Sequence, residues 1–139
     1  MASITLPTRI KLSLDAARQI MAAAEAEAAS KGLSNVAIVI VDEGGYIIHS
    51  VRMDGSLPAS VDIAIAKARA AALLGRPTQF WRELLNSGNL WPLSMPNVVS
   101  AEGGLPLIYG GEVVGGIGVA GASGQEDRAL ADAAVVLLG

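Results

Sequence analysis

The chain has 139 residues, 52% of them hydrophobic, and a formal net charge of -3 at pH 7. This length fits a single domain with one core, and the scattered basic residues leave no basic patch for nucleic acid. Because the chain contains no cysteine, it can form no disulfide, thiol nucleophile or thiolate metal site.

Charged residues make up only 17% of the chain, compared with about 25% in an average soluble domain. This low content predicts less polar surface than a monomer usually shows, and we therefore expect association with copies of the same chain. Residues 1–12 contain no apolar signal-peptide core, and no run of the chain approaches the roughly 18 apolar residues that span a bilayer. We expect a cytoplasmic protein that does not contact a membrane.

The first half of the chain predicts a helix, a hairpin and a second helix. Apolar residues at helical spacing cover 13–32. The β-branched run 36–41 predicts a central strand, and the stretch 46–53 completes a hairpin with it. A second helix is expected over 58–74, where glycine and proline follow.

The second half predicts a short helix over 79–85 that Thr78 caps, a long loop over 86–104, and a hairpin over 105–120 with Gly110-Gly111 as its turn. Ser123-Gly124-Gln125-Glu126 has the S-x-x-E pattern of a capping box and predicts the start of a last helix. The order predicts an α/β (α+β) fold of one domain, residues 1–139, with a largely antiparallel sheet and helices on its faces.

A G-x-G-x-x-G pattern, typical of dinucleotide-binding folds, occurs at 116–121. In those folds another strand, with an acidic residue about 20 positions on, follows the motif. Here one helix follows and the sequence ends, so we expect no dinucleotide. The glycines instead predict that a helix or a partner chain presses against this strand.

Lys67 occupies an unusual place for a charged residue. On the predicted second helix, Asp62 and Arg69 share one polar arc, whereas Lys67 lies among apolar residues and needs a partner. One interpretation is that its stem covers apolar surface while its ammonium group reaches water. The other is an interface pocket, in which Lys67 holds an anionic ligand or transfers a proton.

Gly103 and Gly104 precede a strand, where their backbone N–H groups could face a bound oxyanion. Glu102 beside them could then act as a base or a hydrogen-bond acceptor. The alternative is a loop that only needs unusual φ angles. The aromatic residues Phe80, Trp81 and Trp91 could wall an apolar pocket or serve in ordinary packing.

Arg52 and Asp54 end the second predicted strand. Alternation places Arg52 on the face opposite His49, the only histidine. A lone strand histidine can be structural, solvent-facing or a ligand. With one histidine, no cysteine and dispersed carboxylates, we expect no metal site.

Four segments together resemble the GlcG/HbpS-like haem-degrading family, which includes the C-terminal domain of PduO-type proteins: Arg52-Met53-Asp54-Gly55 and the stretches 60–69, 103–106 and 115–121. The resemblance covers nearly the whole chain. It implies a profilin-like fold with an antiparallel sheet of about five strands, and assembly into dimers or larger rings such as octamers. Some members bind haem or contribute to its breakdown.

This sequence departs from haem-binding members because its first helix, where some relatives place an axial histidine, contains none. Our leading hypothesis is a homo-oligomer that holds a small molecule or haem near the subunit interface, with Arg52, Asp54, Lys67, Gly103, Gly104 and His49 as ligand-binding residues. The alternative is a cofactor-independent isomerase, lyase or hydratase of a small acid or carbonyl compound, with Lys67 and Glu102 as catalytic residues.

Overall fold

The structure, a computed structural model, describes all residues from 1 to 139 and contains one antiparallel sheet with α-helices on both faces. The elements are α1 (Leu14–Ser30), β1 (Ala37–Asp42), β2 (Ile47–Arg52), α2 (Ala59–Leu74), α3 (Thr78–Asn86), the 3-10 helix η1 (Trp91–Ser94), β3 (Gly104–Tyr109), β4 (Glu112–Ala120), α4 (Gly124–Val135) and the 3-10 helix η2 (Val136–Leu138). The strand order is β2-β1-β4-β3. The predicted α/β class is confirmed.

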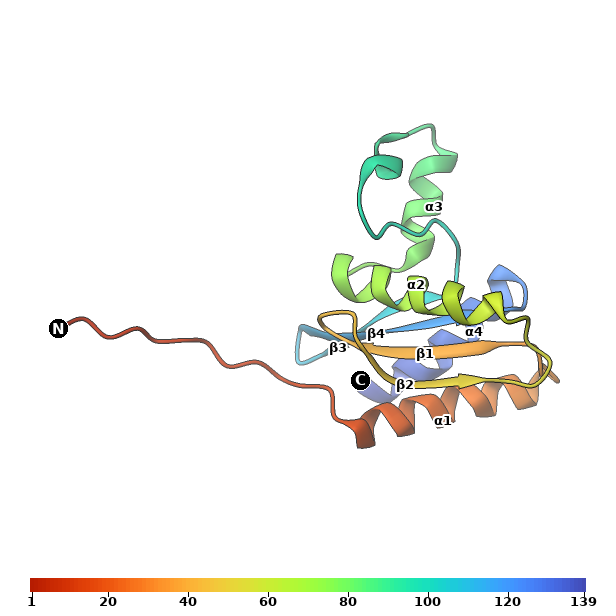
Figure 1. Ribbon diagram of the computed structural model, residues 1–139, viewed down its shortest axis with the longest axis horizontal. Coiled ribbons are helices and arrows are strands. Elements are labelled where there is room, and N and C mark those ends of the chain that lie inside the picture. The colour runs from red at the N-terminus through yellow and green to blue at the C-terminus, as the bar shows by residue number, and fades with distance from the viewer.

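The sheet has four strands, so the expected number of about five is one too high. Residues 1–11 leave the body as an extended segment (Figure 1) and form no strand, whereas Leu12 is buried in the core. The segment's links to the body are near its end, where Arg9 donates to the carbonyl oxygen of Val113 and the Ile10 N–H donates to Glu112. A further strand would need a sheet edge with which to exchange backbone hydrogen bonds, and this segment pairs with none.

The two hairpins form because their sequences match the strand period and the turns. β1 is central, between β2 and β4, as its uninterrupted apolar run predicts. Gly110 and Gly111 have φ values of +57° and +79°, which lets the chain turn directly from β3 into β4.

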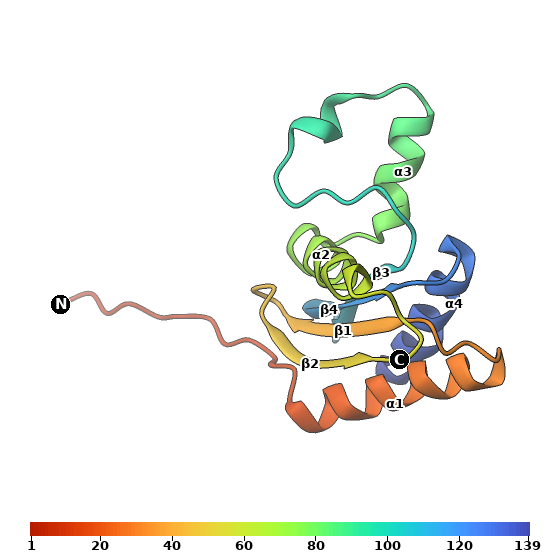
Figure 2. The ribbon, with the colours of Figure 1, turned by 45° about the vertical axis from the view of Figure 1, so that its right-hand side comes forward.

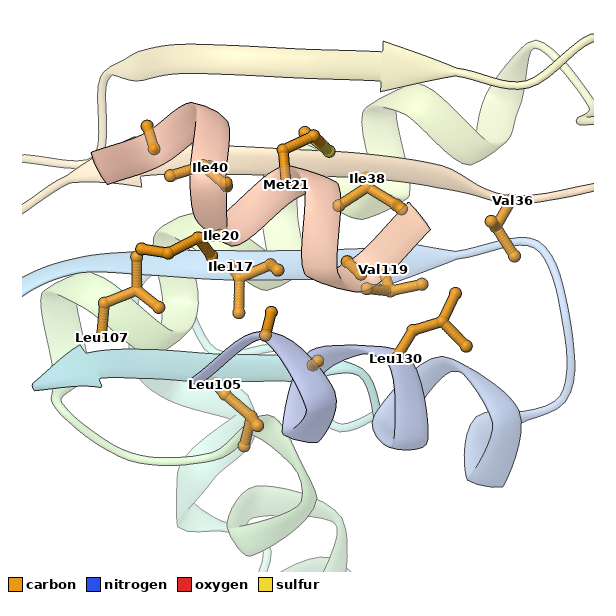
Figure 3. Close-up of a cluster of buried hydrophobic side chains, with 14 of the residues drawn as sticks. Ile20, Met21, Val36, Ile38, Ile40, Leu105, Leu107, Ile117, Val119 and Leu130 are labelled. Atoms are coloured by element: carbon orange, nitrogen blue, oxygen red, sulfur yellow. The ribbon is translucent and has the colours of Figure 1, made fainter. Parts of the chain in front are cut away.

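Helices α1 and α4 cover one face of the sheet, and α2 covers the other (Figure 1, Figure 2). The larger core lies beneath α1 and α4 and contains 17 buried residues. Figure 3 shows these side chains meeting from both helices and three of the strands; its labelled members include Ile20, Met21, Ile38, Ile40, Ile117, Val119 and Leu130. The second core is made mainly of alanines from α2 and residues of β1.

Helix α2 lies unusually close to β4. A Cβ atom at Gly118 would overlap the carbonyl oxygen of Ala64, and one at Gly116 would overlap that of Ala68. Glycine is therefore required at both positions, since any side chain would push the helix from the sheet. The prediction that these glycines let a helix press against the strand is confirmed.

Serine side chains cap the starts of α1 and α4. Ser13 accepts the N–H of Ala16, and Ser123 and Glu126 form the complete capping box of α4. The predicted cap at Thr78 is wrong. Thr78 is the first residue of α3, and its hydroxyl group pairs with Gly104 instead.

Between α2 and β3 the chain makes a long excursion, residues 78–103, which stands clear of the sheet (Figure 1, Figure 2). It holds α3, η1 and the predicted loop. None of the helices combines the length and apolar character needed to cross a membrane.

Candidate functional site

Lys67 is buried between α2, β4 and α4. Only 4% of the residue is exposed. Its Nζ donates to the carbonyl oxygen of Val119 at 2.9 Å and to the carboxylate of Asp127 at 3.2 Å. The prediction that this lysine needs a partner is confirmed. The interpretation in which its ammonium group reaches water is wrong, because Asp127 and the end of β4 receive its hydrogen bonds.

Two glycines enclose the ion pair from the side of β3. Gly103 has a φ of +121°, and a Cβ atom there would lie 3.0 Å from Lys67 Nζ and 3.0 Å from Asp127 Cβ. At Gly104 a Cβ atom would lie 2.6 Å from the carbonyl oxygen of Lys67. The close approach of β3 to α2, and hence the exclusion of water from the pair, depends on both glycines.

Asp127 experiences two opposing influences. Burial raises the pKa of its carboxyl group above the ordinary value of 3.8, while the charge of Lys67 and a hydrogen bond from the N–H of Ala122 lower this pKa; burial is the larger influence. The two carboxylate oxygens of Asp127 have different partners: Oδ1 accepts the N–H of Ala122, and Oδ2 accepts from Lys67. The pair fixes α2, β4 and α4 to one another at this point.

Glu102 lies beside this cluster, at the N-terminal end of α4, where a Cβ atom on Gly124 would lie 3.6 Å from Glu102 Oε2. Its carboxylate pairs with Arg82 of α3 at 2.7 Å, and its side chain is 15% exposed. The Gly104 N–H donates to the Thr78 hydroxyl group at 3.0 Å. An oxyanion could use this N–H only by displacing the threonine.

The structure brings together Lys67, Glu102, Gly103 and Gly104, but it does not bring the other predicted ligand-binding residues to them. Arg52 ends β2, at the opposite edge of the sheet from β3. Three strand spacings separate these edges, a distance of about 14 Å.

Asp54 is exposed in the loop that follows β2. His49 pairs with Ile40 and so faces the core beneath α1 and α4, whereas Arg52 pairs with Ala37 on the side of α2. The predicted opposition of His49 and Arg52 is confirmed. His49 and Lys67 lie on different faces of the sheet.

Four hollows open on the surface of the single chain, and no histidine or methionine lines any of them. Trp81 packs edge-to-face on Phe80 and Trp91, with centroid separations of 5.0 and 6.2 Å. Trp81 is buried and serves in packing within the excursion, and neither tryptophan lines a hollow. Phe80 does line a hollow, together with Pro77, Gln79, Glu83 and Arg128. No group of three carboxylate or histidine side chains is close enough to hold a metal ion.

Sequence reasoning missed Asp127, the partner of Lys67. The signal was its spacing: Asp127 precedes Leu130, Ala131 and Ala134 by three, four and seven positions, and all four are buried. A carboxylate on the apolar face of a helix needs a cation, just as the lysine on α2 needs an anion. The buried lysine of one helix and the buried aspartate of the other could therefore have been predicted to pair.

Comparison with known proteins identifies the family. Residues 12–136 match the family model described as "Haem degrading protein HbpS-like". Protein GlcG of Escherichia coli strain K12 is 36% identical over 114 residues, which cover 82% of this chain and 84% of GlcG. The chain therefore belongs to the HbpS-like family.

Two solved structures have the same fold. A double mutant of Streptomyces reticuli HbpS is 33% identical with a TM-score of 0.85, covering 100% of this chain and 96% of HbpS. The PduOC structure, a complex with haem, is 27% identical with a TM-score of 0.81, covering 91% of this chain and 94% of PduOC. The expected resemblance is confirmed along nearly the whole chain.

Proposed function

We propose that this protein is a homo-oligomer that binds a small organic molecule or haem in a pocket near the subunit interface, on the α2 side of the sheet. The observation that carries the proposal is the exposed apolar surface of the excursion. Leu90, Trp91 and Leu93 are 68%, 51% and 70% exposed. Large apolar side chains grouped in this way are typical of surfaces that a partner covers, and the low charge of the chain agrees with such burial.

The haem-bound PduOC structure supports haem as one candidate ligand. The single chain forms no complete haem site, because neither His49 nor any methionine faces a hollow. A haem would therefore have to be enclosed between subunits. A small organic molecule places fewer demands on the chain, since charged side chains and apolar walls suffice to hold it.

The buried ion pair of Lys67 and Asp127 fixes the elements that would surround such a pocket. Both charges are paired inside the chain. In this proposal Lys67 does not touch the ligand but holds β3 and α4 in the positions that form the pocket. Arg82 and Glu102 lie nearer the surface and offer one charge of each sign. In this proposal Arg52 and Asp54 approach the ligand from a second subunit, because one sheet holds Arg52 and β3 on opposite edges.

The test combines the native mass with titration of haemin and follows the Soret absorption. Stoichiometric binding of haemin that is lost when self-association is disrupted supports haem as the ligand, whereas His49→Ala, on the other face of the sheet, should leave that binding unchanged. Binding of a small acid that weakens in Arg52→Ala or Glu102→Gln, while Glu25→Gln on α1 leaves it unchanged, supports the organic ligand. A monomer that binds neither class contradicts the proposal.

The second candidate is a cofactor-independent isomerase, lyase or hydratase acting on a small acid or carbonyl compound. Glu102 favours it, because this carboxylate is held beside Arg82 and remains partly exposed. Lys67 or Glu102 would move the proton and Arg52 would hold a substrate carboxylate. Turnover that persists in both Glu102→Gln and Lys67→Met would remove these assignments.

A further inference from the structure

A hollow of about 360 Å³ lies on the outer side of α2, beneath the chain that returns from η1 to β3. Figure 2 shows this returning segment above α2. The residues that line the hollow come from two places, Asp62, Ile65, Ala66 and Arg69 on the helix, and Asn97, Val98 and Val99 on the returning segment. This hollow is separate from the ion pair of Lys67, which projects from α2 about 140° away from Asp62 around the helix.

Opposite charges mark the two ends of the hollow. Asp62 and Arg69 are seven residues apart, which places them on the same side of α2 and about 10 Å apart along its axis. No ion pair joins them, and Asp62 makes no hydrogen bond within the chain. The hollow thus presents an anion at one end and a cation at the other, with neither neutralised by a protein partner.

Two contacts fix the conformation of the Arg69 side chain. Its Nη1 donates to the carbonyl oxygen of Gly45 at 2.7 Å, and the guanidinium lies 5.9 Å from the Tyr46 ring centroid. A guanidinium has five N–H donors, so several remain for a ligand. A fixed cation with spare donors suits a carboxylate, which accepts hydrogen bonds from two nitrogen atoms at once.

Asn97 adds a second observation. It is the one non-glycine residue with positive φ, at +66°, and its side-chain amide makes no hydrogen bond within the chain. A positive φ at a non-glycine residue lowers the free energy of unfolding, and this loss is smaller for asparagine than for most residues. The turn places Asn97 at the hollow, where its amide can donate to or accept from a bound polar group.

The wall between the charged ends is apolar. Ile65 and Ala66 form the side on the helix, and Val98 and Val99 form the side on the returning segment. An apolar passage between two charges favours a ligand whose own charges are joined by hydrocarbon.

We propose that this hollow binds a short linear molecule with an ammonium group at one end and a carboxylate at the other, in the manner of an ω-amino acid. Asp62 receives the ammonium group, Arg69 receives the carboxylate, and the valines and Ile65 contact the methylene chain. The proposal is independent of the haem or small-acid pocket proposed above, because it uses the other side of α2.

The test uses δ-aminovalerate as the probe, with valerate and pentylamine as half-molecules, and follows amide chemical shifts in NMR titrations of the full chain. We expect saturable binding of δ-aminovalerate, with shifts at Ala66 and Val98, and at least about tenfold weaker binding of each half-molecule. Asp62→Asn should remove the preference for δ-aminovalerate over valerate, and Arg69→Lys should weaken both. Glu25→Gln, an exposed carboxylate on α1, is the matched control and should change neither.

Absence of saturable binding to the native oligomer overturns the proposal, as does an Asp62→Asn variant that still prefers the ω-amino acid. Asp62 is exposed, so this variant should fold, and circular dichroism checks that it does. Failure here leaves the oligomer and its response to haemin untouched. The two proposals therefore fail separately.

Discussion

Replacing Lys67 by methionine tests whether the buried ion pair holds the α2 side of the molecule together. Methionine keeps the length and apolar stem of lysine but removes the charge and the hydrogen bonds. The carboxylate of Asp127 would then remain buried with the Ala122 N–H as its one partner. Removing one member of a buried pair costs about 3 to 5 kcal/mol, because the other charge is left uncompensated.

This loss should depend on pH in a defined direction. Burial already raises the pKa of Asp127 above 3.8, and Lys67 opposes that rise. Without Lys67 the pKa of Asp127 in the folded chain should rise further. A carboxyl group with a raised pKa binds its proton more tightly in the folded state, so its contribution to stability is fully present below pH 3.8 and is lost as pH rises through the folded pKa. The deficit of Lys67→Met should therefore be largest at neutral pH and shrink on acidification.

Urea unfolding at a fixed protein concentration measures this deficit, at pH 7 and again at about pH 4.5. In the double variant Lys67→Met/Asp127→Asn, the amide oxygen introduced at position 127 could still accept the Ala122 N–H, so part of the loss should return. A Lys67→Met free energy of unfolding within about 1 kcal/mol of the native value at pH 7 would refute the reasoning. So would a deficit that does not change with pH.

Three further changes have definite expected outcomes. Gly118→Ala should lower the free energy of unfolding by more than about 2 kcal/mol in urea titrations, because its Cβ would overlap the Ala64 carbonyl oxygen. Gly44→Ala is the control: its Cβ would meet no atom closer than 3.4 Å, so its effect on the free energy of unfolding should be far smaller. Ser123→Ala removes the cap of α4 and should lower the free energy of unfolding by about 1 kcal/mol. Thermal melting measures this loss, and an unchanged melting temperature would contradict the prediction. Leu93→Asp should weaken self-association in analytical ultracentrifugation without lowering helix content, and an unchanged sedimentation coefficient would exclude this surface as the contact.

The fold could be predicted from the sequence because its elements carry local signals. The uninterrupted run of β1, the Gly110-Gly111 turn and the capping box of α4 each depend on neighbours close in the chain, and the structure has all three. The predicted cap at Thr78 failed for a physical reason. A threonine before a helix can cap it, but here its hydroxyl group has a more distant partner in Gly104.

The candidate site could be predicted only in part. Alternation along β2 correctly separated His49 from Arg52, since side chains of a strand alternate between faces. Strand order across the sheet has no such local signal, so the sequence did not reveal that Arg52 and Gly104 lie at opposite edges. The partner of Lys67 is 60 residues away in the chain. Finding Asp127 requires the buried charges of two helices to be considered together.

Native mass spectrometry of the purified protein tests the central claim most directly, because it reports the number of subunits and any bound ligand in one spectrum. The proposal predicts a mass that is a multiple of the 14.1 kDa chain, with haemin or a small organic ligand at a fixed ratio to the subunits. A 14.1 kDa monomer that retains no ligand at any concentration tested would contradict it.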